Sequence, residues 1–130
     1  MNYLIQKPIL KLLSKINLKL LAISYTILIV VLSLSPIPRA IPNFKFFEMD
    51  KLIHLTMYFI LILLWGINLI SFKFSLIKIL FLTIFFGLLI ETLQYLLPFG
   101  RNFDLGDIIA NSVGAIIGII ILLFYKKKLL

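Results

Sequence analysis

The stretch IETLQYLLPFGRNFDLGDIIANSVGAIIG, residues 90–118, ends one apolar segment of the chain and begins the next. Most of the chain is Leu, Ile and Phe, but this stretch gathers acidic, basic and amide side chains between two apolar runs. The polar residues that stand out in it are Glu91, Gln94, Arg101, Asp104, Asp107 and Asn111. The pattern predicts two membrane helices joined by a short link, with polar side chains near the ends that the link connects.

The composition is that of an integral membrane protein. Of the 130 residues, 62% are hydrophobic and 14% are charged, whereas a soluble domain is about half apolar and about a quarter charged. The length suits one small helical bundle without a separate soluble domain. The chain has no cysteine, which excludes disulfides, thiol nucleophiles and thiolate metal sites. His54 is the single histidine, so one chain cannot form a site of several histidines.

Four apolar segments are long enough to cross a bilayer, which takes about 20 residues. They lie near residues 18–34, 52–70, 76–97 and 108–125. Helices are the expected structure, because lipid offers no partner to backbone polar groups and four segments cannot close a barrel. We therefore predict an all-α fold, an integral membrane bundle of four transmembrane helices with short loops. A basic amphipathic segment, residues 1–17, precedes the four-helix domain of residues 18–130.

The distribution of Lys and Arg predicts the orientation of the bundle. Nine basic residues fall on the side of the two termini: Lys7, Lys11, Lys15, Lys19, Lys73, Lys78, Lys126, Lys127 and Lys128. Four fall on the other side: Arg39, Lys45, Lys51 and Arg101. By the positive-inside rule, both termini are cytoplasmic. The formal net charge of +8 then indicates anionic lipid headgroups on the cytoplasmic side, and not nucleic acid, as the partner.

The lysines of the N-terminal segment recur every four positions between apolar residues. This spacing is typical of a basic helix that lies at the membrane interface. A solvated basic flank of the first span fits the pattern equally well.

The second span begins with polar residues. Asp50 precedes its apolar run, where an acidic residue favours an N-cap. Lys51, His54 and Tyr58 follow at positions i, i+3 and i+7, so they share one face of the predicted helix. His54 lies about one turn into the membrane. Ionisable residues within membrane spans are candidates for function, although a lone histidine with one hydrogen bond also fits.

Glu91 lies about 9 Å inside the end of the third span. A carboxylate costs about 2.5–3.5 kcal/mol at mid-helix and less near the interface. Glu91 must therefore be paired, protonated or exposed to water. Gln94 and Tyr95 lie at i+3 and i+4, and we expect them on the same face. Gly87 lies one turn deeper and allows close approach of another helix.

The fourth span begins with two aspartates. Asp104 and Asp107 fit the N-cap and N3 positions of a capped helix, which explains both without a functional role. Asn111 follows on the face of Asp107, and we expect the Glu91 face of the third span to be its neighbour. Arg101, in the link, is the nearest cation for Glu91 or the aspartates.

Gly114 and Gly118 continue the face of Asn111. Their Gly-x-x-x-Gly spacing is a common element of helix packing in membranes, and packing is the role we expect for them. Capping and packing explain these residues one by one. They do not explain why His54, Glu91 and Asn111, on three different spans, come to a similar depth in the membrane.

Three stretches and their order resemble a known family. DKLIHLTMYFILILLW begins at Asp50, ETLQ at Glu91 and GRNFDLGDIIANSVGAIIG at Gly100. The succession resembles the VanZ-like family, whose pattern runs D-K-x-x-H…Y, E-x-x-Q, G-R-x-x-D-x-x-D and x-x-x-N-x-x-G. The resemblance covers about residues 35–118. The matching positions are Asp50, Lys51, His54, Tyr58, Glu91, Gln94, Gly100, Arg101, Asp104, Asp107, Asn111 and Gly114.

The resemblance implies a multi-pass protein of the bacterial plasma membrane that is linked to the cell envelope. The founding member of the family is associated with reduced sensitivity to the glycopeptide antibiotic teicoplanin. Our first hypothesis is a non-enzymatic envelope factor whose outward polar pocket binds a lipid headgroup or a lipid-linked or lipoglycopeptide ligand. Lys51 and Arg101 would hold phosphate or carboxylate oxygens. The expected ligand-binding residues are Lys51, His54, Tyr58, Glu91, Gln94, Arg101, Asp104, Asp107 and Asn111.

Two alternatives remain. In the first, the protein is an intramembrane enzyme acting on a lipid-linked envelope precursor, with His54 and Glu91 as the candidate acid and base. In that case Glu91, Asp104, Asp107 and His54 could instead hold a divalent cation. In the second, Glu91 couples protons or cations in a small transporter, which would require oligomers to enclose a path. No catalytic motif is recognised, so we favour the non-enzymatic role and assign no cofactor and no metal.

Overall fold

A computed structural model describes residues 2–36, 43–70 and 74–129 of the protein. These residues form four helices, α1 (Asn2–Leu34), α2 (Asn43–Ile70), α3 (Leu76–Leu96) and α4 (Leu105–Leu129), and no strand. Each helix contains an apolar stretch long enough to cross a membrane. The predicted all-α architecture with four transmembrane helices is therefore confirmed. Arg39 and Lys73, which contribute to the predicted orientation, lie outside the described residues.

Three helices begin earlier than the apolar runs suggested, α4 at Leu105 and α1 and α2 by a wider margin. α1 continues without a break from Asn2 through the basic segment to the end of the first span. The placement of residues 1–17 at the membrane interface stays a prediction. α2 begins at Asn43, so Asp50 lies within the helix and the predicted N-cap at Asp50 is wrong. α2 extends before its apolar run because residues 43–51 include no Gly or Pro, and side chains of either polarity continue a helix.

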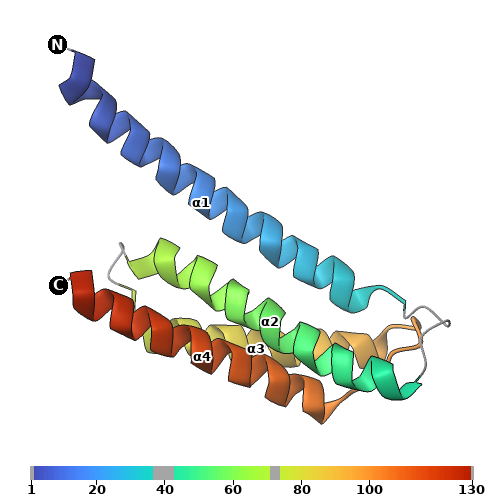
Figure 1. The fold of residues 1–130 in the computed structure, drawn as a ribbon. Coiled ribbons are helices and arrows are strands. Elements are labelled where there is room, and N and C mark those ends of the chain that lie inside the picture. Colours follow the sequence, from blue (N-terminus) through green and yellow to red (C-terminus); the bar gives the residue numbers. More distant parts are fainter. Residues whose placement is uncertain (1, 37–42, 71–73, 130) are drawn as a thin grey trace.

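Three of the helices lie side by side, and α1 leans away from them toward its N-terminus (Figure 1). α1 begins and α4 ends at the same end of the bundle, whereas α2 begins, α3 ends and α4 begins at the opposite end (Figure 1). The most extensive contact joins α2 and α4. The antiparallel order of α2, α3 and α4 thus places the polar starts of α2 and α4 beside the polar end of α3 (Figure 1).

The close contact of α2 and α4 depends on glycine. A Cβ atom added at Gly114 would lie 2.1 Å from the backbone oxygen of Leu55, and one at Gly118 would lie 2.3 Å from the side chain of Ile62. Only a residue without a side chain allows the α4 backbone to come this near to α2. The packing role predicted for this Gly-x-x-x-Gly pair is confirmed.

α1 is attached to α2 by polar bonds at three depths. The Tyr25 hydroxyl donates to the Met57 carbonyl at 3.2 Å and the Trp65 indole donates to the Thr26 hydroxyl at 3.0 Å. The Asn68 amide donates to the Leu18 carbonyl at 3.1 Å. Because lipid cannot satisfy these polar groups, each bond holds the two helices together at its own depth.

The outer surface of the bundle is strongly apolar. Side chains such as Phe81, Phe85 and Phe124 are 68%, 61% and 71% exposed. An exposed apolar surface of this extent would be unstable in water but is the expected boundary with lipid tails. The exposure pattern agrees with four helices surrounded by membrane.

We expect Gly114→Ala to destabilise the protein, because the added methyl group would force α4 away from the Leu55 carbonyl. Overpacking typically costs about 1–3 kcal/mol, and here the atom in the way is backbone. Thermal unfolding of purified protein in detergent measures the change. Val113→Leu is the matched control, because this neighbouring side chain is exposed and adds bulk toward lipid. A Gly114→Ala protein that unfolds at the wild-type temperature would show that the close approach is unimportant.

Candidate functional site

Polar side chains from α2, α3, α4 and the link before α4 meet at the end of the bundle opposite the termini. We call this group the polar cluster. Its members are Asp50, Lys51, His54, Tyr58, Glu91, Arg101, Asp104, Asp107 and Asn111. The predicted convergence of three spans at this end is therefore observed.

Lys51 joins α2 to the start of α4. Its ammonium group donates hydrogen bonds to a carboxylate oxygen of Asp104 and to Oδ1 of Asp107. Asp107 is 4% exposed, and a carboxylate buried to this extent needs a positive partner. Asp107 thus serves a tertiary contact instead of the local N3 capping role.

Asp104 caps the first turn of α4, as predicted. Its Oδ1 accepts a hydrogen bond from the Gly106 amide at 2.7 Å. The amide of Asp104 itself donates to Oε2 of Glu91 at 3.3 Å. In a capping box, the acid that receives the N-cap amide comes from the third residue of the same helix. Here the acid comes from α3, which explains how a fully buried glutamate obtains one of its partners.

His54 of α2 forms a hydrogen bond with Asn111 of α4. Nδ1 of His54 lies 3.0 Å from Oδ1 of Asn111, and both side chains are buried. Nε2 of His54 lies 3.7 Å from Oδ1 of Asp50 and 3.7 Å from Oδ2 of Asp107. The hydrogen-bond partner of Asn111 is therefore on α2. The neighbour that we expected, the Glu91 face of α3, lies beside the same side chain, because Nδ2 of Asn111 is 3.2 Å from a Cβ atom placed on Gly87.

Asp50 is the residue of the site that the sequence interpretation missed. Arg101, in the link, lies 3.4 Å from its Oδ1. Asp50 also precedes His54 by one helical turn and faces it. The i, i+4 spacing of Asp50 and His54 could have revealed the pair. The assumption that α2 starts at Asp50 concealed it, because an N-cap side chain turns back to its own helix.

Carboxylates outnumber cations in the polar cluster. Among the side chains that the structure describes there, four acids (Asp50, Glu91, Asp104 and Asp107) accompany two basic side chains, Lys51 and Arg101. Both cations already bond to aspartates. A phosphate held by Lys51 and Arg101 alone, as the sequence suggested, would have to compete with those carboxylates. The charge balance of these described side chains favours a ligand that brings positive charge.

Gln94 and Tyr95 lie away from the polar cluster. The Gln94 amide donates to the Ser33 carbonyl at 2.6 Å, so it joins α3 to α1 near the end of that helix. Tyr95 is 67% exposed, so the expectation that it shares the buried face of Glu91 was wrong. A step of four residues turns about 40° past a full turn, which is enough here to carry the ring out of the helix contact.

Gly87 of α3 brings three buried polar side chains close together. A Cβ atom there would lie 3.1 Å from the Tyr58 ring and 3.2 Å from Nδ2 of Asn111, and Glu91 follows Gly87 by one turn. Within the described part of the chain, the Tyr58 hydroxyl, Oε1 of Glu91 and Nδ2 of Asn111 have no hydrogen-bond partner. Unpaired buried polar atoms cost about 1–3 kcal/mol each, so their retention points to a role beyond packing.

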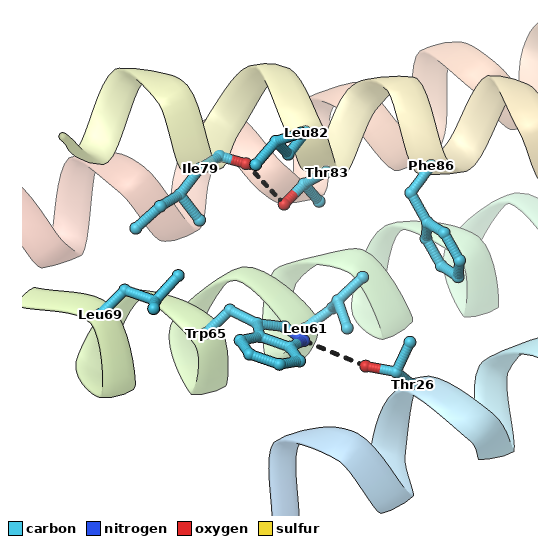
Figure 2. Close-up of a pocket in the computed structure, with 8 residues that line it drawn as sticks. All are labelled: Thr26, Leu61, Trp65, Leu69, Ile79, Leu82, Thr83 and Phe86. Carbon is cyan, nitrogen blue, oxygen red and sulfur yellow. Dashed lines mark hydrogen bonds between the residues drawn. The ribbon is translucent and has the colours of Figure 1, made fainter. Parts of the chain in front are cut away.

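An apolar pocket lies deeper in the bundle, between α1, α2 and α3 (Figure 2). Its volume is about 310 Å³, at the lower end of the usual range for small-molecule sites. The eight side chains that surround it are Thr26, Leu61, Trp65, Leu69, Ile79, Leu82, Thr83 and Phe86. We call it the apolar groove. Leu82 is 58% exposed, so the groove opens toward the lipid beside α3.

Tyr58 lies between the polar cluster and the apolar groove. Its ring contacts Phe86, with centroids 6.1 Å apart, and Phe86 lines the groove. On its other side, the ring lies against Gly87 beside Asn111. Leu61 lines the groove one helical turn after Tyr58. A polar region and an apolar region thus share one side chain as their boundary.

Comparison with known proteins identifies one family. A family model described as VanZ/LLP1 matches residues 6–126, most of the chain. The match confirms the resemblance seen in the three sequence stretches and extends beyond residues 35–118 at both ends. No curated protein and no solved structure matches the chain.

The Asp104 carboxylate should stabilise the fold in a pH-dependent way. Its hydrogen bond from Lys51 holds the pKa of Asp104 below the usual value of 3.8. A carboxyl group whose pKa is lowered by folding stabilises the fold at pH values above its pKa in the unfolded state. This contribution to stability is lost as the pH falls through the lower pKa of the folded state. We expect wild type to exceed Asp104→Asn in stability by up to about 1 kcal/mol near neutral pH, because the pair is partly exposed. The difference should vanish in acid.

Thermal unfolding of both proteins between neutral pH and about pH 3 measures this difference. Asn keeps the oxygen that caps Gly106, so the variant isolates the charge. The control repeats the comparison in a Lys51→Met background, where the cause of the pKa shift is gone. A pH-dependent difference of equal size in that background would mean that Lys51 is not the partner that matters.

Proposed function

This chain belongs to the VanZ/LLP1 family, and we propose that it binds a membrane lipid, with the polar head at the polar cluster and an acyl chain in the apolar groove. The observation that carries the proposal is the shared boundary at Tyr58. A lipid likewise has a polar head directly joined to an apolar tail, so its two parts would match the polar cluster and the apolar groove. Such ligands are what a multi-pass membrane protein meets in its surroundings.

The chemistry of the groove selects an apolar chain. Its polar atoms are already bonded inside the protein, because the Trp65 indole donates to Thr26 and the Thr83 hydroxyl donates to the Ile79 carbonyl (Figure 2). A ligand atom in the groove would therefore meet carbon surface and gain mainly from apolar contact. The carboxylate excess of the polar cluster suits a head with an ammonium group.

The packing of α1 supports access to the groove. α1 is held to α2 at three depths, but its hydrogen bond to α3 lies near the end of the bundle, between Gln94 and Ser33. Deeper in the membrane, α1 leans away from the other helices (Figure 1). The exposed Leu82 at the rim of the apolar groove marks the side from which a chain within the bilayer would enter.

We place the protein in the bacterial plasma membrane, where it would change how an envelope lipid or a lipid-tailed glycopeptide is presented. Teicoplanin susceptibility is the trait that the family suggests. The outward position of the polar cluster follows from the positive-inside rule. A lipid site at that face lies where such a drug would act.

Quenching of Trp65 by brominated lipid tests occupancy of the groove directly, because Trp65 is the single tryptophan and lines the groove. The protein is reconstituted in phosphatidylcholine with a small fraction of brominated phosphatidylethanolamine. We expect stronger quenching than the mole fraction of brominated lipid gives by chance. The same fraction of brominated phosphatidylcholine should quench less, because its quaternary head cannot donate hydrogen bonds to carboxylates.

Two variants make this test specific. Trp65→Phe combined with Phe81→Trp places the indole on a lipid-facing position at a similar depth, where quenching should follow mole fraction. Thr83→Phe adds bulk to the groove and should reduce the quenching of Trp65 to that level. Quenching of Trp65 that follows mole fraction in the wild-type protein would overturn the proposal.

One observation favours a second candidate, an intramembrane enzyme. His54 has a ring nitrogen directed at two carboxylates, an arrangement that also suits proton transfer. Glu91 is fully buried and bonds to the Asp104 amide, so it is less suited to act as a general base. Conversion of a lipid-linked precursor by purified protein, abolished in His54→Gln, would favour this candidate.

Susceptibility of a Gram-positive host that lacks its own homologue tests the cellular role. We expect wild type to raise the inhibitory concentration of teicoplanin by several dilution steps relative to an empty vector, and Glu91→Gln to lose the effect. Thr92→Ala is the matched control, because the Thr92 hydroxyl bonds its own helix at Leu88 and faces away from the polar cluster. Protein levels in the membrane are compared throughout. Protection by Glu91→Gln equal to wild type would remove the cluster from this role.

A further inference from the structure

We propose that Asp50, His54 and Asp107 form a binding site for a divalent transition metal ion of the Mn²⁺ or Zn²⁺ type. The inference goes beyond lipid binding and does not depend on it. It differs from the ion-binding set suggested by the sequence, because Glu91 and Asp104 are not part of the group and Asp50 is.

The geometry of the three side chains fits one ion. One donor atom from each residue lies within 4.8 Å of the donor atoms of the other two. Nε2 of His54 is 3.7 Å from a carboxylate oxygen of each aspartate. Ligand distances of about 2.0–2.2 Å allow two donors of one ion to lie up to about 4.4 Å apart. A small rotation of one carboxylate therefore brings all three donors into range.

Burial and ring orientation provide a second observation. His54 is 3% exposed and Asp107 is 4% exposed, so water does not surround their donor atoms. Nδ1 of His54 is engaged with Oδ1 of Asn111, and the other ring nitrogen, Nε2, faces a carboxylate oxygen of each aspartate at 3.7 Å. These separations exceed hydrogen-bond range and fit two donors that share one ion.

The neighbouring residues hold the three ligands in place. Asn111 fixes the histidine ring through Nδ1. Lys51 bonds Oδ1 of Asp107 and leaves Oδ2 directed at His54. Arg101 lies 3.4 Å from Asp50. Support of this kind behind each ligand is typical of metal sites, where it orients the donor atoms.

The donor set indicates the kind of ion. One imidazole nitrogen with two carboxylates suits Mn²⁺ or Zn²⁺, whereas Ca²⁺ takes oxygen donors alone. Three protein ligands leave coordination positions for water or for an oxygen of a phosphate head. Binding of a phosphate head to the ion rests on the proposed lipid binding. A bound ion would also explain how a cluster rich in carboxylates accepts an anionic ligand.

Titration of the purified full-length protein in detergent, without added lipid, tests the site. Mn²⁺ is added and the free ion is measured by electron paramagnetic resonance. We expect one bound ion per chain at micromolar free metal, displaced by Zn²⁺. Pulsed measurements should show ¹⁴N coupling to Mn²⁺, because His54 is the single histidine. Failure of the lipid experiment above would leave this result unaffected.

Variants test which side chains bind the ion. We expect His54→Gln and Asp107→Asn to abolish binding, and Asn111→Ala to weaken it about 10–100-fold by releasing the ring. Thr92→Ala is the matched control, because the exposed Thr92 hydroxyl bonds Leu88 of its own helix and lies outside the polar cluster. Its affinity should equal that of wild type. Size-exclusion profiles establish that each variant is folded.

Two results would overturn the proposal. One is the absence of stoichiometric Mn²⁺ or Zn²⁺ at millimolar free metal in folded wild-type protein. The other is bound Mn²⁺ without ¹⁴N coupling, or with an affinity that Asp107→Asn leaves unchanged. Either result would assign the three side chains to contacts within the protein alone.

Discussion

The backbones of α2 and α4 approach closely because Gly114 presents no side chain to the Leu55 carbonyl. The distance between the two helices determines which partners their polar side chains can contact. With α4 this near, Lys51 reaches the aspartates that begin α4, and His54 reaches Asn111. A wider separation would leave these groups buried and unpaired, at a cost of about 1–3 kcal/mol for each neutral group and more for each charge. Helix packing and the polar cluster are therefore one structural feature.

The membrane explains why the charged side chains of the cluster bond to one another. Lipid offers no hydrogen bonds, so a charged side chain at this depth must find its partner in the protein. Lys51 and Arg101 meet this demand by bonding aspartates. The amide of Asp104 meets it through Glu91. In these pairs, the positive charges of Lys51 and Arg101 are balanced by aspartates. Among the described side chains, the remaining carboxylates and His54 therefore determine which ligands the cluster can bind.

The lipid and metal proposals concern adjacent parts of one region. The groove is apolar and bounded by Tyr58, whose other side faces the polar cluster. The three ligand residues lie on the far side of that boundary, on α2 and α4. A lipid head that entered the cluster would thus meet either bare carboxylates or an ion with open coordination positions. These two states would select heads of opposite charge, which links the two proposals through electrostatics.

The four membrane helices, the packing glycines and the end of the bundle at which polar residues gather could all be predicted from the amino-acid sequence. These features follow from local composition and spacing, because span length, a missing side chain and helix periodicity are properties of neighbouring residues. The partners of the polar side chains became known from the folded bundle. Asn111 bonds His54 and not the Glu91 face, Asp50 faces His54 instead of capping α2, and Tyr95 points outward. Partner choice depends on the rotation and separation of whole helices, which arise from contacts far apart in the chain.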